Sequence, residues 1–298
     1  MKNLKRYWWP LLWGAVLLAF TVYALLDVFV VRDVYQTEAT EIYFDSFTAL
    51  AETVTPEETE APAVSAEPEV TLTEYTAYDT KIYVAEVALA DVSRLMTAFA
   101  EDSYGRNITA ATSEIASEKG ALLAINGDYY GSHDSGVVIR NGVLYRSTAQ
   151  RDTDILCVYA DGTMAVYGYG EKTAEELLAE GVWQAFSFGP GLLSDGQITV
   201  SATEEVGRAM ASNPRTAIGM IEPGRYVFVV SDGRTEESRG LSLYELAQFL
   251  QSLGVTVAYN LDGGGSSTMV YMGQVVNNPT TSGRSIKERE VSDIVYVV

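Results

Sequence analysis

The sequence predicts an α+β fold: a largely antiparallel, mixed sheet with few inserted helices, preceded by one transmembrane helix. Strand-length apolar runs are joined by pairs such as Asn141-Gly142 and Asp161-Gly162, which favour tight hairpins. Capped helical patterns are few, which indicates that helices are insertions between hairpins. The predicted membrane helix comes from a long uncharged run near the N-terminus.

Composition excludes several classes of function. The chain has 298 residues, 47% of them hydrophobic, enough for one large domain or two small ones. Its formal net charge of -20 argues against binding to nucleic acid. It has one cysteine, Cys157, and one histidine, His133, so an internal disulfide and zinc sites built from several such residues are excluded. Acid–base chemistry therefore falls mostly to carboxylates, tyrosines or lysines.

The N-terminal residues 1–36 read as a cytoplasmic stub followed by a signal anchor. Lys2, Lys5 and Arg6 precede an uncharged run from Tyr7 to Leu26, about the length of a membrane-spanning helix. A cleavable signal peptide is the alternative, but its apolar core is shorter and ends in small residues. We therefore expect a single-pass protein of the cell membrane, with its C-terminal domain on the extracytoplasmic side.

Residues 37–75 and 76–298 differ in character. The first stretch, which includes "TPEETEAPAVSAEPEVTLTE", is rich in Glu, Thr, Ala and Pro and has no sustained apolar period. Such a composition predicts an extended, acidic linker. The folded domain is predicted to begin near Thr76.

Within the domain, the apolar patterns predict elements in the following order. Strands are expected at 81–90, 121–127, 255–262 and 291–298, and hairpins at 137–146, 154–170, 215–234 and 268–277. Helices are expected at 91–100 and 112–120, and after the capping boxes that begin at Thr173 and Ser242.

One stretch, "YNLDGGGSSTMV", combines an acidic side chain with unusual backbone freedom. Asp262 ends a predicted strand and is followed by Gly263, Gly264, Gly265, Ser266 and Ser267. Consecutive glycines let backbone N–H groups converge on an anion, and serine hydroxyls add donors. The alternative is a tight, buried turn that binds nothing.

Further polar clusters lie at the ends of other predicted strands. Each of them alone is more typical of a turn than of a site. The residues are Asn126 and Asp128 after one strand, Arg215 before a second, Asp232 and Arg234 after a third, and Asn278 and Arg284 in a later loop.

Taken together and in this order, these segments resemble the phosphodiester glycosidase family, whose bacterial members include exopolysaccharide biosynthesis proteins. The segments are "NGDYY" (126–130), "PRTAIG" (214–219), "DGR" (232–234) and "NLDGGGSSTM" (260–269). The resemblance covers roughly residues 80–298. One position departs from the pattern: Asp128 stands where many family members have glycine, so it is a poor candidate for a shared catalytic acid.

The resemblance implies an enzyme that hydrolyses a glycosyl phosphodiester at the anomeric carbon of the sugar, in exopolysaccharide or cell-envelope glycan metabolism. It implies no cofactor and leaves a divalent cation open. Under this hypothesis Asp262 is the first candidate for nucleophile or base and Asp232 the second. Arg215, Arg234 and Arg284 are candidates for phosphate binding, because guanidinium groups bind phosphate in a bidentate manner.

The remaining predicted contacts are to sugar hydroxyls or phosphate oxygens. They involve Asn126, Asp128, Asn278, the glycine run 263–265 and the pair Ser266 and Ser267. Two alternatives stay open at this point. One is a polysaccharide-binding module without catalysis, and the other is a metal-dependent hydrolase in which Asp128, Asp232 and Asp262 hold a cation through oxygen ligands.

Overall fold

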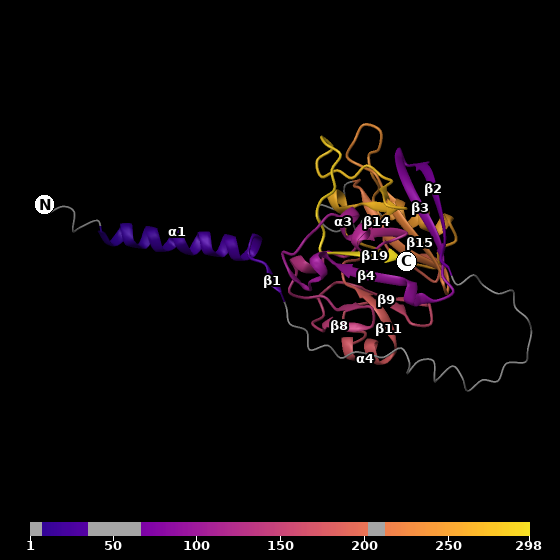
Figure 1. Ribbon diagram of the computed structural model, residues 1–298, viewed down its shortest axis with the longest axis horizontal. Helices are drawn as coiled ribbons and strands as arrows, with labels where there is room; N and C mark the ends of the chain where they lie inside the picture. Colours follow the sequence, from indigo (N-terminus) through magenta and orange to yellow (C-terminus); the bar gives the residue numbers. More distant parts are fainter. Residues whose placement is uncertain (1–7, 35–66, 202–211) are drawn as a thin grey trace, which may run out of the picture.

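The computed structural model describes residues 8–34, 67–201 and 212–298 (Figure 1). In this part of the chain the domain is α+β, as predicted. Its strands form three large sheets and one two-stranded sheet instead of a single mixed sheet. Every strand pair in these ranges is antiparallel. Hairpins join the paired strands that are consecutive in the chain, and the remaining pairs join strands that are not consecutive.

The seven-stranded sheet has the order β13-β12-β16-β14-β15-β3-β2. Its strands are β2 (Glu69–Ala77), β3 (Thr80–Ala88), β12 (Gly191–Ser194), β13 (Gln197–Ile198), β14 (Arg215–Glu222), β15 (Arg225–Ser231) and β16 (Val257–Asn260).

The two five-stranded sheets have the orders β10-β9-β11-β7-β8 and β18-β17-β6-β19-β4. The first contains β7 (Val138–Arg140), β8 (Val143–Arg146), β9 (Ile155–Tyr159), β10 (Met164–Tyr167) and β11 (Val182–Phe186). The second contains β4 (Leu95–Phe99), β6 (Leu123–Asn126), β17 (Met269–Tyr271), β18 (Gln274–Val275) and β19 (Asp293–Val297).

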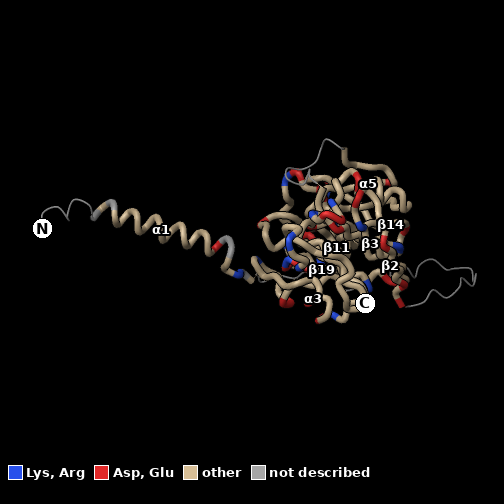
Figure 2. Tube along the Cα trace, turned by 90° about the horizontal axis from the view of Figure 1, so that it is seen from above, with Lys and Arg blue, Asp and Glu red and all other residues tan. Residues whose placement is uncertain are grey.

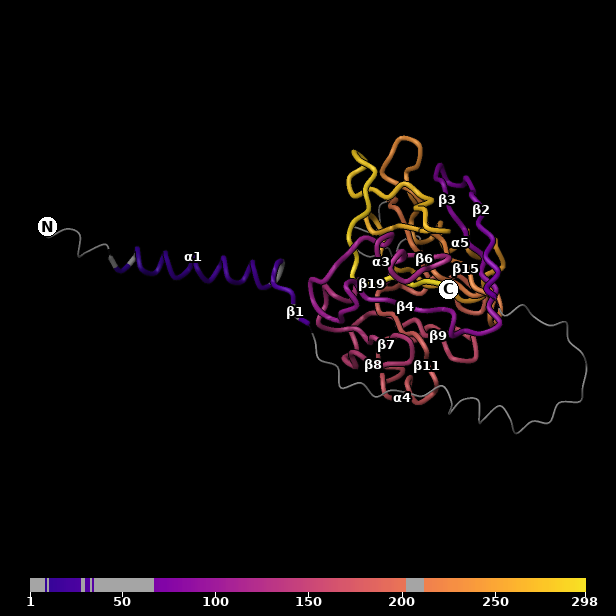
Figure 3. The backbone as a smooth tube through the Cα atoms, viewed as in Figure 1, coloured from indigo at the N-terminus to yellow at the C-terminus, as the bar shows by residue number. Residues whose placement is uncertain are grey.

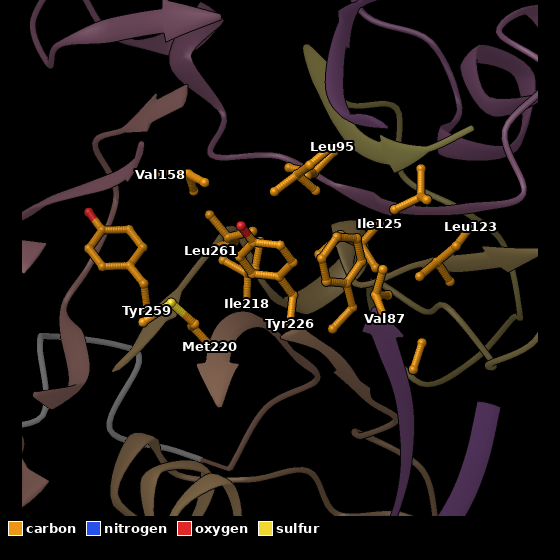
Figure 4. Packing of buried hydrophobic residues seen from close by; sticks show 14 of the residues in the cluster. Val87, Leu95, Leu123, Ile125, Val158, Ile218, Met220, Tyr226, Tyr259 and Leu261 are labelled. Carbon is orange, nitrogen blue, oxygen red and sulfur yellow. The ribbon is translucent and has the colours of Figure 1, made fainter. Parts of the chain in front are cut away.

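The main hydrophobic core lies where the three large sheets meet (Figure 4). Each sheet contributes alternate residues to it, as the two-residue period of a strand requires. In β9, Leu156 and Val158 face this core, whereas Ile155 and Cys157 face the opposite side of their sheet. β9 is therefore buried on both faces.

A helix covers the outer face of each large sheet. α5 (Leu243–Ser252) packs on the seven-stranded sheet, α4 (Ala174–Ala179) on the sheet that contains β9, and α3 (Thr112–Glu118) on the sheet that contains β19. The capping boxes predicted at Thr173 and Ser242 are both present, and each hydroxyl accepts the N–H of the glutamate three residues later.

One predicted helix is wrong. Residues 91–100 form a short 3-10 turn, Val92–Arg94, followed by β4, which pairs with β19 along its whole length. The stretch has a helix-like apolar spacing, but pairing with the C-terminal strand overrides this weak local preference. Likewise, β11, β12 and β13 have no counterpart in the prediction.

Strand structure begins before the predicted domain start at residue 76. All nine residues of β2 pair with β3, and the two strands lie side by side at the edge of the seven-stranded sheet (Figure 3). Partly buried Val70 and Leu72 pack against the main core, while exposed Glu69 and Glu74, on either side of this pair in the strand, keep the edge charged. Most of the predicted linker, residues 37–66, lies outside the described residues.

The predicted N-terminal helix is present, but the structure does not support its predicted membrane span. α1 runs from Trp8 to Phe29 and, in Figure 2, carries almost no charge along its length. Among the described residues, no helix is both long and apolar enough to cross a bilayer.

After α1, the short strand β1 (Asp33–Val34) pairs with β5 (Gly105–Arg106) of the domain.

Candidate active site

A cleft of about 470 Å³ lies at one end of the seven-stranded sheet. It collects residues from the end of β16, the start of β14 and the loop after β15, and from the loop that precedes β9 in the neighbouring sheet. Its polar walls are formed by Gln150, Asp152, Thr153, Asp154, Asn213, Arg215, Arg234, Asn260, Asp262 and Arg289.

Asp262 lies in this cleft, as its position after a strand predicts, and it is 7% exposed. Its Oδ2 accepts hydrogen bonds from Ser266 Oγ at 2.6 Å and Arg289 Nη2 at 2.8 Å. Burial raises the pKa of the Asp262 carboxyl above its usual range, and the Arg289 guanidinium and the Ser266 hydroxyl oppose that rise. A buried carboxyl with a perturbed pKa in a cleft is typical of a functional group.

Arg289 is the most prominent cleft residue that the sequence did not predict. Its Nη2 also donates to the Gly263 carbonyl at 3.2 Å and to Ser266 Oγ at 2.6 Å, and its guanidinium lies 5.8 Å from the centre of the Tyr129 ring. It stands in the charged run "KERE" (287–290), which locally reads as a solvated loop. Only the fold of the chain brings it to Asp262, so no local pattern marks it.

Two of the three predicted phosphate-binding arginines line the cleft. Arg215 donates from Nε to the Leu241 carbonyl, and Arg234 donates from Nε and Nη2 to Asn213 Oδ1 at 3.2 and 3.0 Å. Burial, and then the positive charge of Arg289, lower the pKa of Arg234. Arg234 and Arg289 are thus close enough to repel each other, which favours the binding of an anion between them. The third predicted arginine, Arg284, is exposed and lies outside the cleft.

The glycine run is explained by close approaches within the protein. A Cβ on Gly263 would lie 2.9 Å from the Pro214 carbonyl oxygen, and one on Gly265 would lie 2.3 Å from Thr281 Oγ1. Gly264 has φ +64°, and a Cβ there would meet Arg234 Nη2 at 2.9 Å. The glycines therefore let three neighbouring segments converge on the cleft.

Three N–H groups of the stretch 263–267 donate to carbonyl groups of the protein, and the predicted anion nest stays a prediction. The Gly264 N–H donates to the Pro214 carbonyl at 2.8 Å, and the N–H groups of Ser266 and Ser267 donate to the carbonyls of Gly263 and Gly264 at 3.3 Å. Because these donors are already used, positive charge in the cleft comes from arginine side chains. Gly263 and Gly264 still line the cleft.

Three predicted binding residues lie behind the cleft wall. Asn126 is fully buried: its Nδ2 donates to the Asp262 carbonyl at 2.7 Å, and its Oδ1 accepts from Thr216 Oγ1 at 2.8 Å. The Ser266 hydroxyl donates a hydrogen bond to Asp262 and accepts one from Arg289, and Ser267 is fully buried. Asn126 and Ser266 therefore hold Asp262 in place.

Asp232 and Asn278, both predicted as site residues, contact each other. The Asp232 carboxylate accepts the Asn278 N–H at 2.7 Å on Oδ1 and Asn278 Nδ2 at 2.9 Å on Oδ2. Asp232 is 3% exposed and is not among the cleft residues. In this structure it ties the C-terminal loop, which carries Arg289, to the end of β15.

Asp128 belongs to a buried ion cluster away from the cleft wall. Arg140 Nη2 bridges Asp128 Oδ1 at 2.8 Å and Asp293 Oδ2 at 2.9 Å, and all three side chains are at most 1% exposed. Asp128 also accepts the Ser187 N–H at 2.9 Å. The cluster thus joins the loop after β6 to β7 and β19.

The metal-site alternative is not supported by this arrangement. Asp128 pairs with Arg140, Asp232 pairs with Asn278, and Asp262 is the one member of the three that lines the cleft. In the described ranges, no group of three or more His, Cys, Asp or Glu side chains is placed to hold a metal ion together.

The structure adds a second carboxylate to the cleft. Asp154 enters from the loop before β9, and its Oδ2 accepts the Gly191 N–H at 2.9 Å. Its backbone carbonyl accepts the Tyr259 hydroxyl at 2.5 Å, which fixes the segment. Asp152, two residues earlier, also lines the cleft but is exposed. Asp154 and Asp262 thus reach one cleft from two different sheets.

Residues 119–298 match the family described as phosphodiester glycosidase. The chain is 30% identical over 206 residues to the mouse N-acetylglucosamine-1-phosphodiester alpha-N-acetylglucosaminidase, covering 63% of this chain and 40% of that protein. It is 32% identical over 169 residues to an uncharacterized prophage protein, YomE, of Bacillus subtilis, covering 55% and 26%.

The chain thus spans less than half the length of these relatives. The fold resembles the catalytic domain of the zebrafish N-acetylglucosamine-1-phosphodiester alpha-N-acetylglucosaminidase, solved in a form auto-inhibited by its pro-peptide. The TM-score is 0.63 at 22% identity, and the match covers 89% of this chain and 96% of that one.

Proposed function

The chain belongs to the phosphodiester glycosidase family, and from this premise we propose that it hydrolyses a glycosyl phosphodiester at the anomeric carbon of the sugar. The observation that carries the proposal is the cleft itself, where Asp262 and Asp154 stand with Arg215, Arg234 and Arg289. Carboxylates can act as nucleophile or base at the sugar carbon, and guanidinium groups can bind the phosphate.

In the proposed reaction, the bond between the anomeric carbon and the phosphate oxygen breaks, and the electron pair leaves with the phosphate. The arginines stabilise the charge that develops on that oxygen. Because a phosphate monoester is a weak base, it needs little protonation on leaving. Water supplies the hydroxyl group of the sugar product, and its proton passes to a carboxylate.

The two carboxylates divide the work on the sugar side. Asp262, buried and oriented by Ser266 and Arg289, is our candidate for nucleophile or base. Asp154 is the candidate for the second carboxyl group that glycoside hydrolysis ordinarily uses. We propose envelope or exopolysaccharide glycans as the biological substrates because the chain resembles bacterial family members.

The test is turnover of a glycosyl phosphodiester beside a neutral glycoside of the same sugar. We expect hydrolysis of the diester, and a loss of about 10- to 100-fold in kcat/KM for Arg289→Lys, since a point charge replaces a planar fork. Arg284→Lys, in the same loop but outside the cleft, is the matched control and should leave the rate unchanged. Binding of a glycan without turnover would favour a non-catalytic module instead.

A further inference from the structure

We propose that a second cavity, next to the cleft, binds the part of the substrate that lies beyond the phosphate; this inference rests on the proposed function. The cavity has a volume of about 400 Å³ and is lined by Thr281, Ser285, Lys287, Glu288, Arg289 and Glu290. We call it the aglycone cavity.

Arg289 connects the two spaces, since it lines both the cleft and the aglycone cavity. Arg234, which lines the cleft, donates from Nη1 to the carbonyl of Thr281, a residue of the aglycone cavity. A phosphodiester carries two substituents. With its phosphate on these two arginines and its sugar beside Asp262, the second substituent fits the cavity that shares Arg289.

The glycine run makes this arrangement possible. Thr281 sits so close to Gly265 that a Cβ there would lie 2.3 Å from Thr281 Oγ1. The Arg289 N–H donates to the Gly265 carbonyl at 3.1 Å. Through these two contacts, Gly265 holds the C-terminal loop between the cleft and the aglycone cavity.

The lining of the aglycone cavity indicates the chemistry of its ligand. No aromatic or aliphatic residue is among the six. Glu288 accepts hydrogen bonds from the Ser113 N–H at 3.0 Å and the Ser113 hydroxyl at 2.5 Å, and Glu290 accepts one from the Thr109 hydroxyl at 2.8 Å. These carboxylates are therefore engaged with the neighbouring α3 region.

Lys287 is exposed, and in the described ranges it makes no ion pair. Its ammonium group offers three hydrogen-bond donors to oxygen atoms. The geometry therefore favours a hydrophilic, hydroxyl-bearing aglycone over an alkyl chain, with Lys287 as the residue that selects it.

The experiment compares three diesters of one sugar 1-phosphate, whose second substituents are methyl, glyceryl and hexyl. The wild-type protein should hydrolyse the glyceryl diester with a kcat/KM about tenfold above that of the methyl diester, and the hexyl diester no better than the methyl one. Lys287→Met should abolish the glyceryl preference while keeping the methyl rate. Lys172→Met, on a surface lysine that pairs with Glu180, should keep the preference.

Turnover of all three diesters with no glyceryl preference would overturn this inference alone. So would a preference that survives in Lys287→Met. A complete lack of turnover, in a protein that melts normally, would overturn the proposed function and this inference with it.

Discussion

At the residue scale, the positions that matter are those where backbone and side chains come into contact across the cleft. Gly264 shows this most directly. Its φ of +64° is unfavourable for other residues, and the space where a Cβ would stand is held by Arg234 Nη2 at 2.9 Å. The lack of a side chain at Gly264 therefore leaves room for Arg234, a proposed phosphate-binding residue.

Gly264→Ala should lower kcat/KM on a glycosyl phosphodiester and also destabilise the fold by about 1 kcal/mol, through backbone strain and displacement of Arg234. Gly254→Ala is the matched control: Gly254 has φ +79°, and a Cβ there meets nothing within 4 Å. Melting curves and rates of both variants test this. Equal activity losses in the two would contradict the role given to Arg234.

Asp262 and its motif could be predicted from the sequence, whereas Arg289 and Asp154 could not. Asp262 follows a strand and precedes a glycine turn, and both are local features. Arg289 lies in a long loop and donates directly to Asp262, and Asp154 precedes a strand of another sheet. Only the tertiary structure therefore brings these two residues to the cleft. Asp232 and Asp128 look like site residues in sequence but are engaged by Asn278 and Arg140.

At the scale of secondary-structure elements, local chemistry decided which predictions succeeded. Asn141-Gly142 and Pro223-Gly224 specify hairpins by turn geometry alone, and both hairpins are present. Capping boxes likewise mark α4 and α5. The helix predicted over β4 is wrong because this segment forms a strand only by pairing with β19, almost 200 residues later in the chain. The local sequence pattern carries no information on such a distant pairing.

The buried cluster that joins these elements should make stability depend on pH. Burial raises the pKa of Asp293 to about 7, the Arg140 guanidinium opposes the rise, and the Asp128 carboxylate adds to it. The folded state then keeps a proton that the unfolded chain loses above about pH 4. This contribution is complete at pH below about 4 and is lost as pH rises through about 7.

We therefore expect the free energy of unfolding to fall by up to about 1.4 kcal/mol per pH unit between these values from this group. Asp293→Asn keeps an oxygen for Arg140 but cannot titrate. Its free energies of unfolding at pH 5 and pH 8 should therefore differ less than those of the wild type. Denaturant titrations at both pH values measure this. An unchanged difference would show that Asp293 does not hold the proton.

At the scale of the whole molecule, attachment to a membrane remains a prediction. α1 exposes large apolar side chains, among them Leu11, Leu17 and Phe20, but the structure does not identify α1 as a membrane-spanning helix. The full chain should sediment with membranes after an alkaline carbonate wash if the N-terminal run is embedded in the bilayer. Complete release into the supernatant would contradict a spanning helix.

The whole domain brings three sheets together around one core, and the cleft gathers residues from two of these sheets and from the C-terminal loop. Its acidic balance of -20 does not attract an anionic diester. The proposed chemistry therefore depends on a local concentration of arginines beside one buried carboxylate.

The most direct test of this account is the rate of Asp262→Asn on a glycosyl phosphodiester, measured beside its melting curve. Asparagine keeps the shape of the side chain and removes its charge, and burial already disfavours that charge. We predict a loss of several orders of magnitude in kcat, comparable to the loss when a catalytic acidic group is neutralised, with no loss of thermal stability. Near-normal turnover by a normally folded variant would contradict the central claim that Asp262 carries the chemistry.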